Sequence, residues 1–260
     1  MKLKPIQVEK PWGRTRLPPP FATEGERRIG EIWFEGPAAL PLLVKYIFTS
    51  EKLSVQVHPD DDQARARGHA GGKNECWYIL DADPGARLGL GVREEMDAAT
   101  LRAAALDGSI ERRMDWKEVK PGDVFYVPAG TIHAIGGGIS LIEVQQSNDI
   151  TYRLYDYGRA RELHLDDAVA VARARPYAPA GPPSGGASGG RVLVNGSDFS
   201  LVQVDDPRSD PMADRRRWVV PLRGTAAGGG AGECLLIEAG AKLTLGTGAA
   251  ALVAAEGPLD

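Results

Sequence analysis

The sequence has the composition of an ordinary globular protein, with 260 residues of which 43% are hydrophobic and 25% are charged. This length allows one or two domains with a buried core. A formal net charge of −4 argues against a nucleic-acid-binding surface, which would need a strong basic excess. No apolar run approaches the roughly 18 residues that span a bilayer, and MKLKPIQVEKPWG at the N-terminus lacks the apolar block of a signal peptide.

Only two cysteines are present, Cys76 and Cys234. They form no disulfide framework, which indicates a reducing compartment. We therefore expect a cytoplasmic protein that has neither a membrane nor a nucleic acid as partner.

The first part of the chain is predicted to consist of short β-strands. Runs of β-branched and aromatic residues closed by Gly, Pro or Asp lie at 30–36, 42–48, 52–58, 76–80, 123–128, 140–146 and 150–156. A helical interval is expected from Met96 to Leu106, ended by Gly108 at a C′ position. A second helix is expected from Leu165 to Ala174, before Pro176.

The stretch 177–190, YAPAGPPSGGASGG, has the composition of a linker or long loop. Strands are predicted after it at 191–196, 199–204, 216–222, 233–239 and 241–246. Many short strands and few helices favour a barrel or sandwich. We expect a catalytic barrel domain over 1–160, a helix and linker over 161–190, and a C-terminal β-unit over 191–260. That last unit contains no histidine and is expected to be structural.

The segment LSVQVHPDD combines an apolar and a polar face. Strand alternation places Leu53, Val55 and Val57 on one face and Ser54, Gln56 and His58 on the other. An isolated histidine beside a turn is more often an ordinary polar residue, so this assignment depends on its partners. In GKNECWYIL, Glu75 opens an apolar strand, where a carboxylate is costly to bury unless it is paired or bound to a cation. The alternative is that Glu75 lies in water, just outside the strand. Neighbouring Cys76 alternates to the opposite face and is expected to be a packing residue and not a ligand.

The most specific motif is PGDVFYVPAGTIHAIGG. Pro121 and Gly122 turn the chain into a strand, Pro128 and Gly130 build a tight turn, and His133 begins the return strand. This spacing resembles the second signature motif of the cupin superfamily, whose histidine is a metal ligand. An asparagine that follows in that motif is Gly137 here.

Gln56, His58 and Glu75 stand where cupins commonly carry His-x-His and a glutamate. Two imidazoles, one carboxylate and one amide oxygen suit Zn²⁺ better than a redox metal that relies on three histidines. His69 and His164 are expected to be a solvated residue and a local polar contact. The expected fold is mainly β, a cupin (jelly-roll) barrel that carries the metal site, plus a second, smaller β-domain and few helices.

The motifs LSVQVHPDD, GKNECWYI, PAGTIHAIGGG and EVQQSNDITYRLYDYGR, in this order, resemble the type I mannose-6-phosphate isomerases in their short cupin form. The resemblance extends from EKPWG at 9–13 through RELHLDDA at 161–168, about two-thirds of the chain. It implies metal ligands at Gln56, His58, Glu75 and His133. It also implies a catalytic arginine at Arg153 and a substrate-pocket lysine at Lys73.

The resemblance further implies a zinc-dependent aldose–ketose isomerase, with one Zn²⁺ per chain, that interconverts mannose 6-phosphate and fructose 6-phosphate through an enediolate. Its partner is then a phosphorylated hexose, and the protein is a monomer or homodimer. Lys73, Arg153 and Arg159 are the candidate cations for the phosphate, although Arg159 follows a turn and could equally be solvated. Glu143 is a candidate base, or alternatively orients a ligand imidazole.

Three other readings of a metal-binding cupin remain open. They are an isomerase of an unphosphorylated sugar, an iron dioxygenase, and a non-catalytic sugar-binding protein. Oxygen consumption, relative activity on mannose and mannose 6-phosphate, and binding without turnover distinguish them from the main hypothesis.

Overall fold

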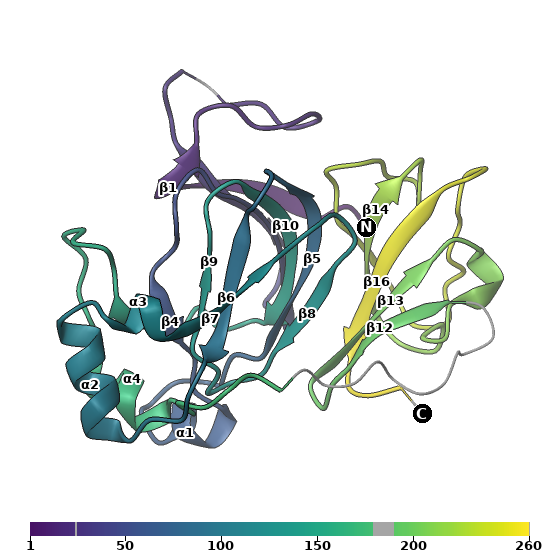
Figure 1. Ribbon diagram of the computed structural model, residues 1–260. Helices are drawn as coiled ribbons and strands as arrows, with labels where there is room; N and C mark the ends of the chain where they lie inside the picture. Colours follow the sequence, from purple (N-terminus) through teal and green to yellow (C-terminus); the bar gives the residue numbers. More distant parts are fainter. Residues whose placement is uncertain (24, 179–189, 260) are drawn as a thin grey trace.

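The computed structural model describes residues 1–23, 25–178 and 190–259. Three antiparallel sheets and a group of short helices form successive layers, with the helices on one side of a central barrel and the C-terminal sheet on the other (Figure 1). The mainly β fold with a barrel and a second β-unit is therefore confirmed. Nearly all of the predicted linker, 179–189, lies outside the described residues. Within those residues, no helix has the length and apolar character needed to cross a membrane.

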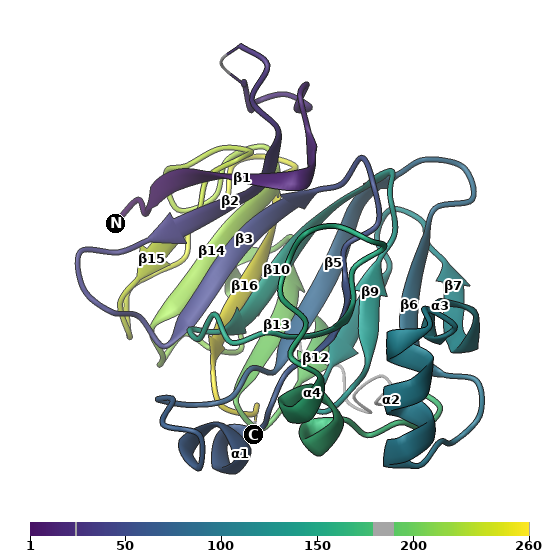
Figure 2. The same ribbon diagram turned by 90° about the vertical axis from the view of Figure 1, so that its left-hand side faces the viewer.

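The barrel is built from two sheets. In spatial order, the first contains β1 (Lys4–Arg14), β2 (Ile29–Glu35), β3 (Leu42–Phe48), β10 (Ile139–Gln146), β5 (Glu75–Ala82) and β8 (Val124–Val127). The second contains β11 (Tyr152–Tyr155), β4 (Val55–Val57), β9 (His133–Ile135), β6 (Arg87–Val92) and β7 (Met114–Glu118). Figure 2 shows β3, β10 and β5 side by side in the middle of the first sheet.

Strand β10 explains how the first sheet carries both a core and a site. Its side chains alternate between two buried faces, which is why the segment is almost continuously apolar. Leu141 packs inside the barrel with Trp77, while Ile142 and Val144 face the C-terminal sheet. Glu143 is the charged residue on the inward face, and the same alternation in β5 turns Glu75 inward.

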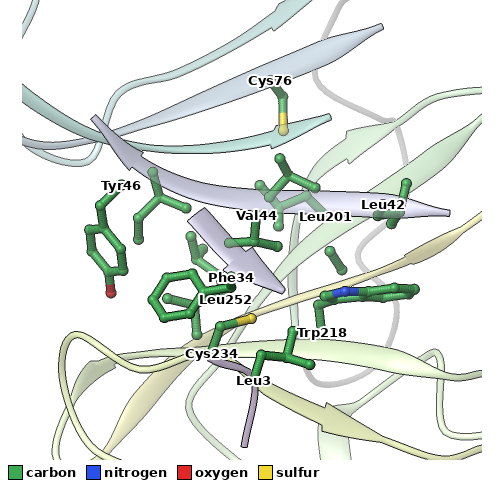
Figure 3. Packing of buried hydrophobic residues seen from close by; sticks show 14 of the residues in the cluster. Leu3, Phe34, Leu42, Val44, Tyr46, Cys76, Leu201, Trp218, Cys234 and Leu252 are labelled. Carbon is green, nitrogen blue, oxygen red and sulfur yellow. The ribbon is translucent and has the colours of Figure 1, made fainter. Parts of the chain in front are cut away.

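The C-terminal unit is a single sheet. It contains β12 (Arg191–Asn195), β13 (Phe199–Val204), β16 (Ala250–Glu256), β14 (Arg217–Arg223) and β15 (Leu235–Ile237), in that spatial order, with a short 3-10 helix, η1 (Pro207–Ser209). Its inner face packs Leu201, Trp218 and Leu252 against the outer face of the first sheet (Figure 3). Cys76 lies in this buried layer, which confirms its predicted packing role.

The two units are also joined by the N-terminus. The backbone N–H of Leu3 donates to the carbonyl of Cys234 at 2.9 Å, so the first residues extend the edge of the C-terminal sheet beside β15. The C-terminal unit therefore lies behind the first sheet of the barrel.

The helices cover the outer face of the second sheet. They are α1 (Asp61–Arg65), α2 (Ala98–Leu106), α3 (Ile110–Arg113) and α4 (Leu165–Val171). Val55 and Val57 of β4 pack against apolar side chains of α2 and α4, as the alternation predicts. Leu53 is the exception, because the strand begins only at Val55, and Leu53 packs inside the barrel instead.

Helix α2 agrees with the sequence prediction, since Asp97 caps it and Gly108 has a φ of +75° at its C′ position. The prediction that the second helix reaches Ala174 is wrong. Helix α4 ends at Val171, because the N–H of Arg173 donates to Gly130 at 2.7 Å. The chain is thereby drawn alongside the turn that precedes His133.

One prediction for the C-terminal unit is wrong, because the segment 241–246 forms no strand. One strand was not predicted: the AALVAAE segment forms β16 at the centre of the sheet. Alanine has a low intrinsic strand propensity, so composition gave no signal. β16 is nevertheless buried on both faces and is paired on both edges with β13 and β14, where packing outweighs propensity.

Candidate metal centre

Three strands of the second sheet place site residues in one cross-strand row. Gln56 of β4 pairs directly with His133 of β9 on one side and with Arg153 of β11 on the other. Residues paired in this way project from the same face of a sheet. The row therefore carries Gln56, His133 and Arg153 toward the barrel interior.

The turn before His133 is fixed by its sequence. Gly130 has a φ of +82°, which favours glycine, and the N–H of Thr131 donates to the Pro128 carbonyl at 3.1 Å. The N–H of Gly130 donates to the His58 carbonyl at 2.8 Å. This hydrogen bond brings the two histidine-bearing segments together.

The loop that carries Lys73 is also fixed by close contacts with the backbone. A Cβ atom on Gly72 would lie 2.4 Å from the backbone carbonyl carbon of Asp60, so only glycine fits there. The N–H of Lys73 then donates to the Pro59 carbonyl at 3.0 Å. Lys73 is thereby placed beside the start of β5, two residues before Glu75.

The centre itself joins His58, Glu75 and His133, all of which are buried. His58 Nε2 lies 3.4 Å from Glu75 Oε2, and His133 Nε2 lies 3.3 Å from Glu75 Oε1. The Nδ1 atom of His58 lies 2.7 Å from the Ile150 carbonyl oxygen, and that of His133 lies 2.9 Å from the Thr131 carbonyl oxygen. Because a carbonyl can only accept, each Nδ1 carries the proton and each Nε2 presents a lone pair.

This donor set fits a divalent cation. The ligand atoms of His58, Glu75 and His133 lie within 4.8 Å of one another, and neither Glu75 oxygen accepts a well-directed hydrogen bond. Lys73 Nζ forms an ion pair with Glu75 Oε2 at 2.7 Å, which leaves Oε1 facing the lone pair of His133. Electron-rich atoms that converge in a buried space need a positive charge between them.

Gln56 lies beside the centre, with its amide nitrogen directed toward His133. Its Nε2 lies 3.2 Å from His133 Nε2, and its Oε1 accepts a hydrogen bond from Ser54 at 3.0 Å. A half-turn of the amide plane exchanges these two atoms. The oxygen then faces the centre, and the Ser54 hydroxyl can accept from the amide nitrogen.

The electrostatics keep the ligands in their metal-binding protonation states. Burial, reinforced by the charge of Lys73, lowers the pKa of His58 to about 4, and burial lowers the pKa of His133. Burial alone would raise the pKa of Glu75, but Lys73 and His58 hold it well below its usual range. At neutral pH both imidazoles are therefore neutral and the carboxylate is ionised, as a metal requires.

The depressed pKa of His58 predicts a pH-dependent stability for the protein stripped of metal. The unfolded chain takes up a proton at His58 near pH 6.5, whereas the folded chain does so only near pH 4. Between these values the unfolded state binds more protons, so stability falls as the pH falls. We expect a loss of about 2 kcal/mol between pH 7 and pH 5, measured by urea unfolding after chelation. His58→Gln should show a shallower slope than His69→Gln, which replaces an exposed histidine, and equal slopes would contradict the assignment.

A polar cavity of about 300 Å³ lies next to this centre. Of the predicted site residues, Gln56, Lys73, Glu143 and Arg153 line it. All of its lining residues come from the barrel unit, between Lys10 and His164.

Glu143 is held by two neighbours on the adjacent strands. Its Oε1 pairs with Lys45 Nζ at 3.3 Å, and its Oε2 accepts a hydrogen bond from Trp77 Nε1 at 2.9 Å. Glu143 does not orient a ligand imidazole, because Nδ1 of His58 and Nδ1 of His133 each hydrogen-bond to a backbone carbonyl.

Arg159 is not brought to the cavity. Its guanidinium donates to Asp156 at 3.1 Å and to the Lys52 carbonyl, and it does not belong to the cavity lining. The turn 156–159 therefore directs the Arg159 side chain away from the cavity lining.

Four cationic or basic lining residues escaped the sequence analysis: Lys10, Lys45, Arg161 and His164. The sequence contains a signal for Lys45, because this lysine interrupts the apolar run LLVKYIF. Strand alternation places it on the same face as Ile47, which also lines the cavity. His164 makes the predicted local contact, accepting from the Arg153 N–H at 3.2 Å, but its ring also lines the cavity. His69 is exposed, as predicted.

The fold and the site together define a cupin-type barrel with a centre suited to a divalent metal.

No family model matches the chain. Among curated proteins, it is 44% identical over 142 residues to the mannose-6-phosphate isomerase of Streptococcus mutans, a match that covers 52% of this chain and 44% of that protein. It is 35% identical over 215 residues to the probable mannose-6-phosphate isomerase GmuF of Bacillus subtilis, covering 65% of this chain and 67% of that protein. The chain therefore belongs to the mannose-6-phosphate isomerase family, although its match spans less than half of the S. mutans protein.

Solved structures agree with this placement. The crystal structure of the mannose 6-phosphate isomerase from Bacillus subtilis superposes with a TM-score of 0.82 at 26% identity, covering 97% of this chain and 98% of that one. A zinc-bound mannose 6-phosphate isomerase shares the fold with a TM-score of 0.70 at 14% identity, covering 98% of this chain and 99% of that one.

Proposed function

We propose that the protein is a metal-dependent aldose–ketose isomerase that interconverts mannose 6-phosphate and fructose 6-phosphate. The observation that carries this proposal is the buried His58–Glu75–His133 constellation beside a polar cavity, in a chain of the mannose-6-phosphate isomerase family. The cavity contains a carboxylate and several cations, which suit proton transfer on an anionic substrate.

We infer that the metal is Zn²⁺, one per chain, held by Gln56, His58, Glu75 and His133. Two neutral imidazoles, one carboxylate and one amide oxygen form a borderline-hard set that suits zinc. When bound, zinc would polarise the substrate oxygens and reduce the cost of the negative charge that develops during enediolate formation.

Glu143 is the residue that we assign to proton transfer between C1 and C2. Its carboxylate lies in the cavity lining between Lys45 and the Trp77 N–H, and neither of its oxygens serves the metal ligands. Burial alone would lower the pKa of Lys73, but the charges of Glu75 and Glu143 raise it, so Lys73 remains an ammonium group. Lys73 can therefore donate a hydrogen bond to a substrate oxygen but cannot act as the base.

Arg153 is assigned to stabilise the developing charge and to hold a sugar oxygen. It lies opposite Gln56 in the sheet register and lines the same cavity. A guanidinium keeps its proton at working pH, so the residue acts through charge and hydrogen bonds. The C-terminal unit, 191–260, is assigned a structural role because it packs behind the barrel's first sheet.

A coupled assay of mannose 6-phosphate conversion tests the proposal. The zinc-loaded protein should turn over mannose 6-phosphate, and chelation should reduce turnover by at least about 100-fold, since a catalytic metal supplies several kcal/mol of transition-state stabilisation. Readdition of zinc should restore the rate. Binding of the sugar phosphate without conversion would refute the enzyme assignment, and oxygen consumption by an iron-loaded form would favour a dioxygenase.

A further inference from the structure

The ammonium groups that line the cavity are individually neutralised. Each has its own carboxylate partner, at 3.3 Å for Lys10 and Glu31, 3.3 Å for Lys45 and Glu143, and 2.7 Å for Lys73 and Glu75. The remaining acid of the lining is Asp149, which is exposed. These lysines therefore offer hydrogen bonds to a ligand but little uncompensated charge.

Two guanidinium groups, those of Arg153 and Arg161, also line the cavity. Within the part of the chain that the structure describes, the only hydrogen bond of the Arg153 side chain goes to the Glu162 carbonyl, at 3.3 Å. Arg161 and Arg159 both pair with Asp156, and Arg159 also pairs with Glu51 at 3.7 Å. Burial and the nearby charge of Arg161 lower the pKa of Arg153, although the carboxylates of Asp156, Asp149 and Glu162 oppose this shift.

Asp156 fixes the orientation of Arg161. This carboxylate is only 2% exposed and accepts two hydrogen bonds from Arg161, from Nε and Nη2, both at 2.6 Å. Such a fork holds the guanidinium in one plane. It leaves Nη1 of Arg161 available to a ligand in the cavity, which Arg161 lines.

His164 extends the cross-strand row beyond Arg153. Its N–H donates to the Arg153 carbonyl at 2.9 Å, and its Nδ1 accepts from the Arg153 N–H at 3.2 Å. Nδ1 is thus the acceptor, so the neutral ring carries its proton on Nε2 and can donate from there. The row runs from His133 through Gln56 and Arg153 to His164. The strand that carries Arg153 therefore separates His164 from Gln56.

We propose that Arg161 and His164 bind the phosphate group of the substrate, and that Asp156 is the positioning residue that holds Arg161. This assignment rests on the proposed function and specifies which end of the site selects a phosphorylated sugar. A hexose 6-phosphate carries its phosphate at the end of the molecule that lies opposite C1 and C2. In the site, Arg161 and His164 are likewise separated from the metal ligands by the cross-strand row. A guanidinium fork and an imidazole N–H match the geometry of a phosphate dianion.

The test compares Arg161→Gln with Arg159→Gln, which removes the other guanidinium that binds Asp156. Arg161→Gln should reduce kcat/KM for mannose 6-phosphate by at least tenfold and leave kcat/KM for unphosphorylated mannose unchanged. Arg159→Gln should change both values by less than twofold. Asp156→Asn should raise KM for mannose 6-phosphate with a smaller effect on kcat, and Arg161→Lys should restore part of the loss.

Calorimetric titration with inorganic phosphate, on protein stripped of metal, gives a readout that needs no turnover. The unsubstituted protein and Arg159→Gln should bind phosphate, and Arg161→Gln should bind it at least tenfold more weakly. Equal binding by all three, or no binding by the unsubstituted protein, would overturn the proposal. If phosphate binding depends on Arg161 but no isomerisation is detected, the anion site stands and the isomerase assignment fails.

Discussion

The His133→Ala variant is expected to lose metal and activity together. Its Nε2 lone pair faces Glu75 Oε1 at 3.3 Å, and alanine offers no replacement donor. Loss of even an outer partner of a metal ligand costs 10–100-fold in affinity, so loss of the ligand itself should cost at least about 100-fold. Zinc content measured after dialysis, together with the isomerase assay, checks this result.

The matched control for this variant is His69→Ala, which removes an exposed histidine and should keep both zinc and turnover. Circular dichroism should show that both variants retain the β fold, because the barrel core does not depend on His133 alone. Stoichiometric zinc in His133→Ala would show that this imidazole is not a ligand.

The Arg153→Ala variant is expected to keep its metal and fold but to lose most of its turnover. Removal of a preorganised donor from a developing negative charge reduces kcat by about 10²–10³-fold. The backbone of Arg153, which pairs with Gln56 and His164, is unchanged by the substitution. Zinc content and thermal stability should therefore match those of the unsubstituted protein, and kcat should fall.

Arg87→Ala is the matched control, because Arg87 is a strand arginine of the same sheet whose side chain is 54% exposed and pairs with Glu118. It should retain full activity. Arg153→Lys separates charge from geometry, since lysine supplies a cation without the planar fork. Near-normal kcat in Arg153→Ala would limit Arg153 to a structural role.

The residues of the candidate metal centre could be predicted from the sequence because the pattern that marks each of them lies within a few neighbouring residues. His133 follows a Pro–x–Gly turn whose geometry depends on a few neighbouring residues, and His58 and Glu75 each follow from alternation within one short strand. The fold class followed similarly, from the density of short strands and turns. The two long helical intervals were located correctly, apart from the C-terminal end of α4.

Residues whose roles depend on distant partners could not be assigned in the same way. Arg159 and Arg161 are two positions apart and look alike in sequence, yet only Arg161 lines the cavity. The difference arises because Asp156, buried by the fold, binds both and orients them differently. For His164 the sequence predicts only a local polar contact, and its place beside Arg153 appears only when the segment hydrogen-bonds to β11.

The sequence by itself predicted a barrel of the cupin kind and a buried centre that contains His58, Glu75 and His133, since turns and strand alternation are encoded within a few residues. Only the tertiary structure decided the rest of the cavity. It paired Lys45 with Glu143 across two strands, separated Arg161 from Arg159, and placed the alanine-rich β16 at the centre of a sheet. Ion pairs and burial between segments far apart in the chain determine these features, and no local pattern records them.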